Sequence, residues 1–467
     1  SPSCGERFRF ADRLYWMPPL HFTALAGVYA AGFPPLLGGR WLSALAGAAT
    51  LLLLLQWAGG VLAEPWEPRP HDSPGPGTAS ARRRAWLLIG IAVAFTADPM
   101  LWKAHRTIRP EAMLTLWSVL AVSAAWNPER RLRGMLAGAA TALALLTHPN
   151  GILTAVAVAG VLVLRRAVDS RVRRDLLSAA GAFVLLCLPT ALYFLEDRAG
   201  GFASVIGQNA PHFHGEGSAP IWIQWWREHL RYRMYFGWPY LVLPLLLWAA
   251  TLAAAVRMRA GAALGWVVGA YLAGLACMPN KSELYLTLPA PFVYLLAARV
   301  GMRMRPRLAA ALGALWLANL LLADAALLRR NRACDYEAWS RPLAAAVPAG
   351  AGVAGSFLAW RPSRGPPFYS VSRVRAGDLH EARPEYLVWS EDLTQGPQFA
   401  RLRRELAPFL AEHAEVLLRI ESACYGTAVL YRPRWDEANA ANWERYGLDD
   451  AAPAMHPSAP AKSPIPR

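Results

Sequence analysis

The sequence is poor in charge and especially in lysine. Only 17% of its 467 residues are charged, whereas soluble proteins carry about a quarter. Lysine occurs three times, at Lys103, Lys281 and Lys462, although Lys and Arg together number 48. The arginines stand in short groups between apolar runs, so the net charge of +16 indicates membrane orientation. We therefore expect no nucleic-acid partner.

Cysteine is scarce as well. The chain has five cysteines, and their positions do not have the spacing of a metal site. No carboxylate cluster suggests a metal either, so we expect no metal and no cofactor. Cys334 and Cys424 fall in the same soluble region and are candidates for a disulfide if that side is oxidising; the sequence does not settle whether they pair. The chain starts at Ser1 without a signal-peptide pattern, and we expect an N-terminal piece to be missing.

What the sequence has instead is long apolar runs. Hydrophobic residues make up 55% of the chain, and a helix needs about 20 apolar residues to cross a bilayer. The fold class predicted is an all-α polytopic membrane bundle of about ten transmembrane helices, followed by a small C-terminal α/β soluble domain. The predicted spans are 39–63, 85–102, 111–126, 133–147, 151–164, 175–195, 236–256, 261–278, 284–299 and 308–328.

Arginine placement orients these spans. Arginine clusters occur at every second connection, which puts those connections in the cytoplasm. They lie within 82–84, 130–133, 165–174, 257–259 and 299–307. The segments 1–38 and everything after 329 then lie outside, in the periplasm of a bacterial inner membrane. Two segments, 18–31 and 218–235, are predicted to lie along the outer membrane surface.

The composition changes after residue 329. Strands are predicted at 352–359, 386–389, 416–419 and 427–431, and a helix at 399–413. The predicted domains are an outer and juxtamembrane segment (1–38), a transmembrane domain (39–328), a periplasmic α/β domain (329–436) and a disordered tail (437–467).

Polar residues with catalytic potential gather in the outer loops. The deep spans are nearly free of ionisable residues, which argues against ion-coupled transport. In 103–111, Pro110 and Glu111 open a helix, but a capped helix start does not explain the neighbouring cations, which would hold a phosphate. A lone histidine in a turn, as at His148, is more often structural. Lys281 is either a snorkelling side chain or a functional one.

Several motifs together resemble one family. They are Met-Pro-Pro-Leu-His at 17–21, Arg40, Arg-Pro-Glu at 109–111, Leu-Thr-His-Pro-Asn-Gly at 146–151, and Lys-Ser-Glu-Leu-Tyr-Leu-Thr-Leu-Pro at 281–289. Their order resembles that of GT-C superfamily glycosyltransferases that use polyprenyl-phosphate sugars. The branch is that of the protein O-mannosyltransferases and lipid A aminoarabinose transferases (glycosyltransferase family 39 type), and the resemblance covers about residues 15–299.

The resemblance implies transfer of a sugar from a polyprenyl phosphate to a lipid, glycan or protein acceptor at the outer face, with Lys281 and Tyr285 by the carrier phosphate. The acidic motif of the family would lie before Ser1, which leaves Asp12 and Glu111 as weak candidates for the base. The phosphate-binding candidates are Lys103, His105, Arg109, His148, Lys281 and Tyr285. Aminoarabinose transferases have a lysine near the position of Met17.

Two other functions remain open. A transporter or flippase of lipid-linked sugars predicts an internal repeat or buried charges, and the sequence has neither. A non-catalytic membrane scaffold predicts that the outer-loop cations can be neutralised without consequence.

Overall fold

The computed structural model describes residues 18–64, 78–127, 132–164, 172–196, 220–257, 262–278, 282–332, 334–355, 368–370, 379, 382–391, 393 and 400–435. The chain divides into two compact units. One is Leu14–Arg329, and the other joins Ser1–Arg13 to Arg330–Arg467. The first is a helical bundle and the second is a small α/β unit, which confirms the predicted fold class. The tail from 437, predicted to be disordered, lies outside the described residues.

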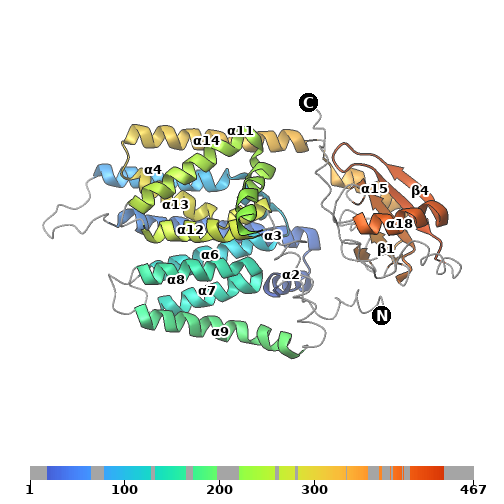
Figure 1. Cartoon of the computed structure of the whole chain (residues 1–467), viewed down its shortest axis with the longest axis horizontal. Helices are drawn as coiled ribbons and strands as arrows, with labels where there is room; N and C mark the ends of the chain where they lie inside the picture. Colours follow the sequence, from blue (N-terminus) through green and yellow to red (C-terminus); the bar gives the residue numbers. More distant parts are fainter. Residues whose placement is uncertain are drawn as a thin grey trace. The chain divides into compact units, whose positions relative to one another are not determined.

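The helices of the first unit pack side by side along much of their length (Figure 1). In chain order they are α2 (Leu20–Ala30), α3 (Pro35–Ala63), α4 (Thr78–Thr96), α5 (Pro99–Arg106), α6 (Pro110–Trp126), α7 (Arg133–Thr147), α8 (Ile152–Leu164), α9 (Val172–Glu196), α11 (Ile221–Arg257), α12 (Ala262–Cys277), α13 (Ala290–Gly301) and α14 (Pro306–Asn331), with the short 3₁₀ helices η2 (Pro149–Gly151) and η6 (Glu283–Thr287).

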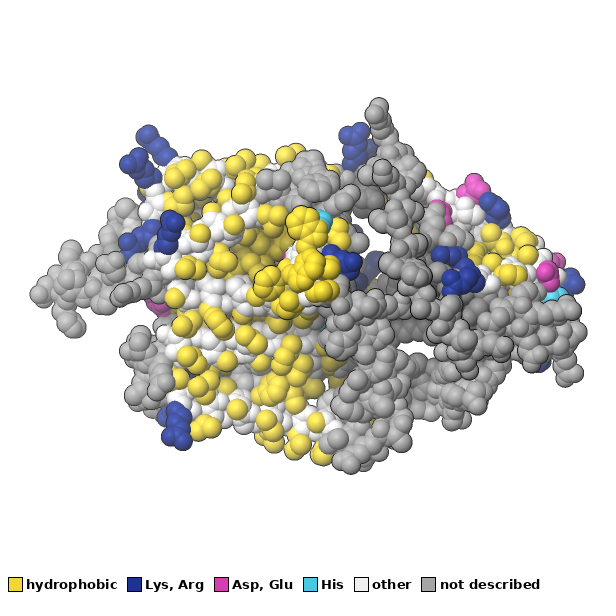
Figure 2. All heavy atoms as spheres, viewed as in Figure 1, with side chains coloured by type: hydrophobic (Ala, Val, Ile, Leu, Met, Phe, Trp, Pro, Cys, Tyr) yellow, Lys and Arg dark blue, Asp and Glu magenta, His cyan; other side chains and the backbone are white. Residues whose placement is uncertain are grey.

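Apolar side chains cover much of the surface of these helices (Figure 2), as a membrane protein requires. Among the described residues, three helices are long and apolar enough to cross a bilayer, at Leu37–Ala63, Val172–Tyr193 and Pro306–Arg329. A bent pair, Ser80–Thr96 with Pro99–Arg106, makes a fourth. The other apolar helices have 10–17 residues, so the count of about ten crossings stays a prediction.

Prolines explain where the predicted spans break. The predicted span 85–102 bends by 57° between α4 and α5, because Pro99 disfavours a helical residue before it and Asp98 caps the new helix. The Asp98 carboxylate accepts from the amides of Met100 (2.7 Å) and Leu101 (3.1 Å). The predicted span 284–299 similarly begins as η6, since Pro289 interrupts the α-helix before α13.

The arginines at one end of this unit do more than set its orientation. Arg133 forms a buried ion pair with Asp175, with 2.6 Å between Nε and Oδ2. Arg299 donates to the carbonyls of Val61 and Glu64 at the end of α3. Arg83 donates to Gly301 and Met304 at the end of α13. These bonds satisfy carbonyls that a helix end leaves unpaired. We call this end, marked by Arg83, the arginine-rich end.

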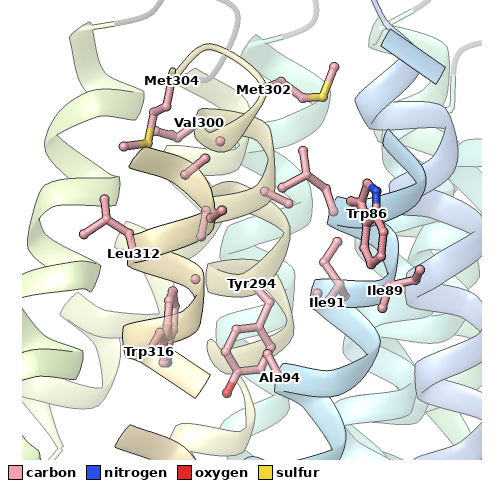
Figure 3. Close-up of a pocket in the computed structure, with 18 of the residues that line it drawn as sticks. Trp86, Ile89, Ile91, Ala94, Tyr294, Val300, Met302, Met304, Leu312 and Trp316 are labelled. Atoms are coloured by element: carbon pink, nitrogen blue, oxygen red, sulfur yellow. The ribbon is translucent and has the colours of Figure 1, made fainter. Parts of the chain in front are cut away.

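A large groove also opens in the helical unit. It lies between α4, α13 and α14, and its volume is about 1230 Å³. Figure 3 shows the apolar and aromatic side chains that line it, among them Trp86, Tyr294 and Trp316.

The second unit is a mixed sheet with a helix on each face. The strands are β1 (Val353–Gly355), β2 (Phe368–Ser370), β3 (Tyr386–Ser390), β4 (Ala414–Ile420) and β5 (Ala428–Pro433), in the order β2-β1-β3-β5-β4. The strands β2, β1 and β3 run parallel, whereas β5 runs antiparallel to both β3 and β4.

Alternation along β3 explains the two layers. Leu387 and Trp389 pack against Leu406 and Phe409 of helix α18 (Ala400–His413), while Val388 packs with helix α15 (Tyr336–Ala346) on the opposite face. All of β3 is therefore buried. Helix α15 and strand β2 did not figure in the sequence prediction.

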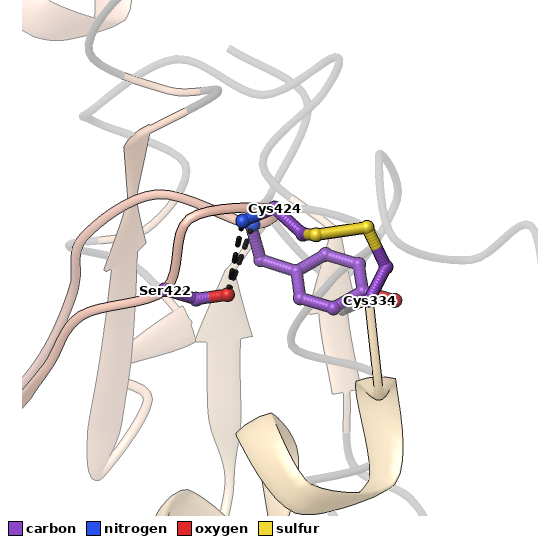
Figure 4. The surroundings of a disulfide bond; sticks show 4 residues. Cys334, Ser422 and Cys424 are labelled. Atoms are coloured by element: carbon purple, nitrogen blue, oxygen red, sulfur yellow. Dashed lines mark hydrogen bonds between the residues drawn. A yellow bond between two sulfur atoms is a disulfide. The ribbon is translucent and has the colours of Figure 1, made fainter. Parts of the chain in front are cut away.

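The structure pairs Cys334 with Cys424 in a disulfide, with 5.3 Å between the two Cα atoms. Figure 4 shows the bond beside the turn between β4 and β5, where Ser422 Oγ accepts from the amides of Cys424 (3.2 Å) and Tyr425 (3.3 Å). The disulfide ties the segment before α15 to this turn, and so links two distant parts of the unit.

Candidate functional site

Five segments that are distant in sequence meet at one end of the helical unit. They are α2, α5, the start of α6, the η2 turn between α7 and α8, and η6, which also contacts α11. We call this the α2 end. Most of the described side chains that the sequence singled out lie here, together with several that it did not.

Glu111 is the most deeply buried acid of this cluster. Its side chain is 1% exposed, and both carboxylate oxygens accept from Arg109, at 3.1 Å from Nε and 2.9 Å from Nη2. The pair arises because Arg109-Pro110 ends an extended segment and starts α6, which places Glu111 in the first turn. Arg109 itself remains 44% exposed. Glu111 thus holds a partly exposed guanidinium, and both of its oxygens are occupied.

Lys103 forms the second ion pair of the cluster. Its Nζ lies 2.9 Å from Oε1 of Glu283 on η6, and the two side chains are 46% and 20% exposed. Partial burial raises the pKa of Glu283, but the hydrogen bond and charge of Lys103, with Arg109 nearby, bring it below the ordinary value. Glu283 is therefore ionised at neutral pH. The pair links α5 to η6, although 180 residues separate its members.

His148 is buried in the turn between α7 and α8, with 4% of it exposed. Burial lowers its pKa to about 4; Glu111 opposes this shift, and Arg109 and His21 add to it. The ring is neutral at pH 7, with Nδ1 accepting from the amide of Asn150 at 3.1 Å. Nε2 then carries the proton. His148, which the sequence predicted to bind phosphate, is accordingly a neutral hydrogen-bond donor, because the buried turn excludes the water that a cation would need.

Tyr285 lies against this histidine. The two rings meet edge to face with 5.4 Å between centroids, and the guanidinium of Arg231 lies 5.8 Å from the centre of the tyrosine ring. The structure therefore brings Lys103, Arg109, His148 and Tyr285 to the same end of the bundle.

His21 belongs to the same cluster, although the sequence pointed to it only as part of a motif. It is 3% exposed on α2, and burial lowers its pKa to about 4 against the opposing charge of Glu111. Its Nδ1 is buried without a hydrogen-bond partner among the residues that the structure describes. Position 21 directly after Pro-Pro-Leu was the available signal, because those prolines start the short helix that carries it.

Arg231 is the other residue that the sequence analysis missed. Its side chain is fully buried, and it donates to the carbonyls of Ser282 (2.5 Å) and Leu275 (2.9 Å) and to Glu228 (2.6 Å). It thereby fixes the segment that leads into η6. The sequence placed 218–235 along the membrane surface, whereas residues from Ile221 onward form a single helix, α11. The tryptophans Trp222, Trp225 and Trp226 are exposed as expected.

His105 does not join the cluster. Lys103 and His105 stand two residues apart on α5, so their side chains leave on opposite faces of the helix. The His105 ring stacks on Phe95 at 5.6 Å, and it fills the space beside Gly47, where a Cβ would come within 2.5 Å of the ring. The place of His105 is in the packing of α3, α4 and α5 and not in the cluster at the α2 end.

Three residues that the sequence singled out lie outside the described residues: Asp12, Met17 and Lys281. Within the described ranges, no group of three His, Cys, Asp or Glu side chains has the arrangement of a metal site. The α2 end thus offers two partly exposed cations held by carboxylates, Arg109 and Lys103, beside buried neutral imidazoles. Such an arrangement suits an anion next to a polar, uncharged group.

The comparisons with known proteins agree with this architecture. No family model and no curated protein matches the sequence. The fold matches two crystal structures of ArnT, a lipid A aminoarabinose transferase of the GT-C type, from Cupriavidus metallidurans. The structure bound to undecaprenyl phosphate has 15% identity and a TM-score of 0.57, over 92% of this chain and 91% of that one. The apo structure has 16% identity and a TM-score of 0.55, over 92% and 93%. The chain therefore has the GT-C fold that its motifs predicted.

Proposed function

We propose that this protein is a membrane glycosyltransferase that moves a sugar from a polyprenyl-phosphate carrier to an acceptor hydroxyl at the outer face of a bacterial inner membrane. The observation that carries the proposal is the pair of carboxylate-held cations, Arg109 and Lys103, beside neutral histidines at the α2 end of a GT-C fold. The printed ligand of a matching ArnT structure, undecaprenyl phosphate, belongs to the same class of carrier.

The cations suit the leaving group of this reaction. When the sugar leaves its carrier, negative charge develops on the lipid phosphate, and fixed donors that stabilise this charge lower the barrier. Arg109 and Lys103 are each held from behind by a carboxylate but stay nearly half exposed. A guanidinium has five N–H donors in a flat fork, and the described bonds of Arg109 to Glu111 use two of its nitrogens.

The histidines suit the sugar. A hexose or pentose presents hydroxyls, which pair well with neutral donors and acceptors. His148 offers Nε2–H, and His21 has a buried Nδ1 that lacks a partner within the described ranges. Filling such a vacancy with a substrate hydroxyl would recover a hydrogen bond worth about 1 kcal/mol or more.

The carboxylate that deprotonates the acceptor is not assigned to Glu111. Both oxygens of Glu111 already accept from the guanidinium of Arg109, so the geometry engages this carboxylate as the support of Arg109. We propose that Glu111 positions Arg109, and that the base comes from a part of the chain that the structure does not describe. Asp12 remains a candidate by sequence.

The test is sugar transfer in native membranes from a radiolabelled polyprenyl-phosphate sugar. We expect Arg109→Gln and Lys281→Ala to reduce transfer at least tenfold, about 1.4 kcal/mol of transition-state stabilisation, at unchanged membrane insertion. Arg257→Gln, at the end of α11 away from this cluster, is the matched control. If Arg109→Gln and Lys281→Ala transfer at the wild-type rate, the cations have no role in chemistry and the scaffold alternative takes precedence.

A further inference from the structure

The groove between α4, α13 and α14 is separate from the α2 end. It runs along α4 from Ser80 to Ala94 and ends at Tyr294 and Trp316. Its lining is mostly apolar (Figure 3). Arg82 and Arg83 line it near Ser80. At about 1230 Å³ it exceeds the usual range of pockets for drug-sized ligands, about 300–1,000 Å³.

Two glycines keep this groove open. A Cβ added to Gly90 on α4 or to Gly313 on α14 would meet nothing within 4 Å, and both glycines line the groove. In membrane bundles, helical glycines usually let helices approach closely, as Gly138 does here against the backbone of Ala179, at 2.0 Å from the added Cβ. Gly90 and Gly313 serve no such contact, although a glycine inside a helix is less stable than an alanine. Their effect is to leave room along the groove.

The groove has the depth of one membrane leaflet. From Arg82 to Ala94 the helix rises about 18 Å, and one leaflet of the hydrocarbon core is about 15 Å thick. Trp86, near the arginines, is 66% exposed, as expected of an aromatic side chain at the headgroup level.

The open end of the groove is strongly basic. Arg83 donates to the carbonyls of Gly301 and Met304, which fixes the turn after α13. Met304 and Pro306 line the groove, and Arg305 and Arg307 are their neighbours in sequence. Arg82, Arg305 and Arg307 are exposed, and no salt bridge joins any of them to an acid among the described residues. By the positive-inside rule this end faces the cytoplasm.

We infer that the groove binds an anionic phospholipid of the inner leaflet, with an acyl chain along α4 and α14 and its phosphate on the arginines at the mouth. Basic pockets between transmembrane helices on the cytoplasmic side suit anionic headgroups. The position of the arginines also distinguishes this occupant from a carrier lipid. A carrier with its phosphate at the α2 end would enter from the opposite side of the membrane. The inference is independent of the proposed transferase activity.

The test is lipid retention by the purified full chain in detergent, measured by native mass spectrometry against added phosphatidylglycerol or phosphatidylcholine. We expect phosphatidylglycerol to bind at least tenfold more tightly. Gly313→Leu, which fills the groove, and the double variant Arg82→Gln/Arg305→Gln should each weaken this binding at least tenfold. Gly181→Leu on α9, another glycine with nothing within 4 Å, and the exposed Arg173→Gln are the matched controls.

Equal binding of the two lipids, or undiminished binding by Gly313→Leu, would overturn the inference. So would displacement of phosphatidylglycerol by a polyprenyl phosphate in the wild type but not in Gly313→Leu, because the groove would then hold the carrier tail. If Gly313→Leu does not fold, Gly90→Leu fills the same groove from its opposite wall and decides the question.

Discussion

Each cation at the α2 end is positioned by a carboxylate from a different part of the local structure. Arg109 is held by Glu111 two residues later, and Lys103 by Glu283 on η6. The sequence identified the cations but not this pairing. A carboxylate behind a cation fixes its position but also lowers its net positive charge, so the geometry of each pair matters as much as its charge. The position of each cation can therefore be tested separately from the stability that its ion pair contributes.

Exchanging Lys103 and Glu283, the more exposed ion pair, tests stability and transfer separately. An exposed ion pair contributes only about 0.2–1 kcal/mol to stability, so Lys103→Gln should change the melting temperature little. The double exchange Lys103→Glu/Glu283→Lys restores the ion pair but moves the positive charge from α5 to η6. We expect it to melt like the wild type and to transfer sugar at least tenfold more slowly. Wild-type transfer by the exchanged protein would show that the position of the lysine does not matter.

The buried histidines predict a pH dependence of stability. The pKa values of His21 and His148 are lowered to about 4, below the unfolded value of about 6.5. Between these values the unfolded chain binds more protons, so stability is full above about pH 6.5 and falls as the pH approaches 4. The loss is on the order of 3 kcal/mol for each histidine. The charge of Glu111 opposes both shifts, and Arg109 and His21 reinforce the shift of His148.

Melting temperatures of the purified protein between pH 4.5 and 7.5 measure this effect. We expect a steady fall below pH 6.5, and a shallower fall in His148→Gln, which cannot be protonated there. His229→Gln, an exposed histidine on α11, is the control and should follow the wild type. A melting temperature that is constant over this range would mean that the histidines are not buried as neutral rings.

At the scale of elements, local chemistry explains most boundaries. Asp98-Pro99 ends α4 and starts α5, Arg109-Pro110 starts α6, and Pro289 separates η6 from α13. These signals are readable in the sequence, and yet the predictions ran straight through two of them, because mean hydropathy averages over a single proline. The missed helix α15 likewise has a clear start, since Asp335 accepts from the amides of Glu337 and Ala338.

The disulfide between Cys334 and Cys424 carries the element-scale prediction. It spans 90 residues, and closing a loop of this size stabilises a folded domain by about 4–5 kcal/mol in the chain-entropy model. We expect Cys334→Ser, or treatment with a reductant, to make the region after residue 334 more sensitive to limited proteolysis. Cys187→Ser, at a free cysteine on α9, should leave the digestion pattern unchanged. An equally resistant Cys334→Ser protein would show that the disulfide contributes little.

At the scale of the whole molecule, polar chemistry is divided between the two ends of the bundle. Arginines bond to helix-end carbonyls at one end, and the cation–carboxylate pairs and neutral histidines gather at the other. Between them, polar groups pair with one another, as Ser118, Thr154 and Tyr271 do at 2.8 and 3.1 Å. Such bonds hold helices together in a membrane, where water offers no alternative partner.

This division predicts a topology that labelling can check. In spheroplasts of a strain that expresses the protein without its free cysteines, a membrane-impermeant maleimide should label Ser218→Cys, in the connection before α11, without lysis. Ser73→Cys, in the connection before α4, should be labelled only after lysis, because the arginine clusters predict that this connection lies in the cytoplasm. The reverse pattern would invert the molecule and move the cations of the α2 end to the cytoplasmic face.

The sequence by itself determined the membrane class, the helical bundle with its small α/β unit, and the positions along the chain at which polar residues gather. These follow from composition and short-range order, which hydropathy and proline report directly. The tertiary structure alone decided which of those residues meet. In the folded chain His105 packs against Gly47, and the buried Arg231 holds the segment that leads into η6. His21 lies near Glu111 and His148. Contacts between segments that are distant in sequence depend on how helices pack, and no local pattern encodes that packing.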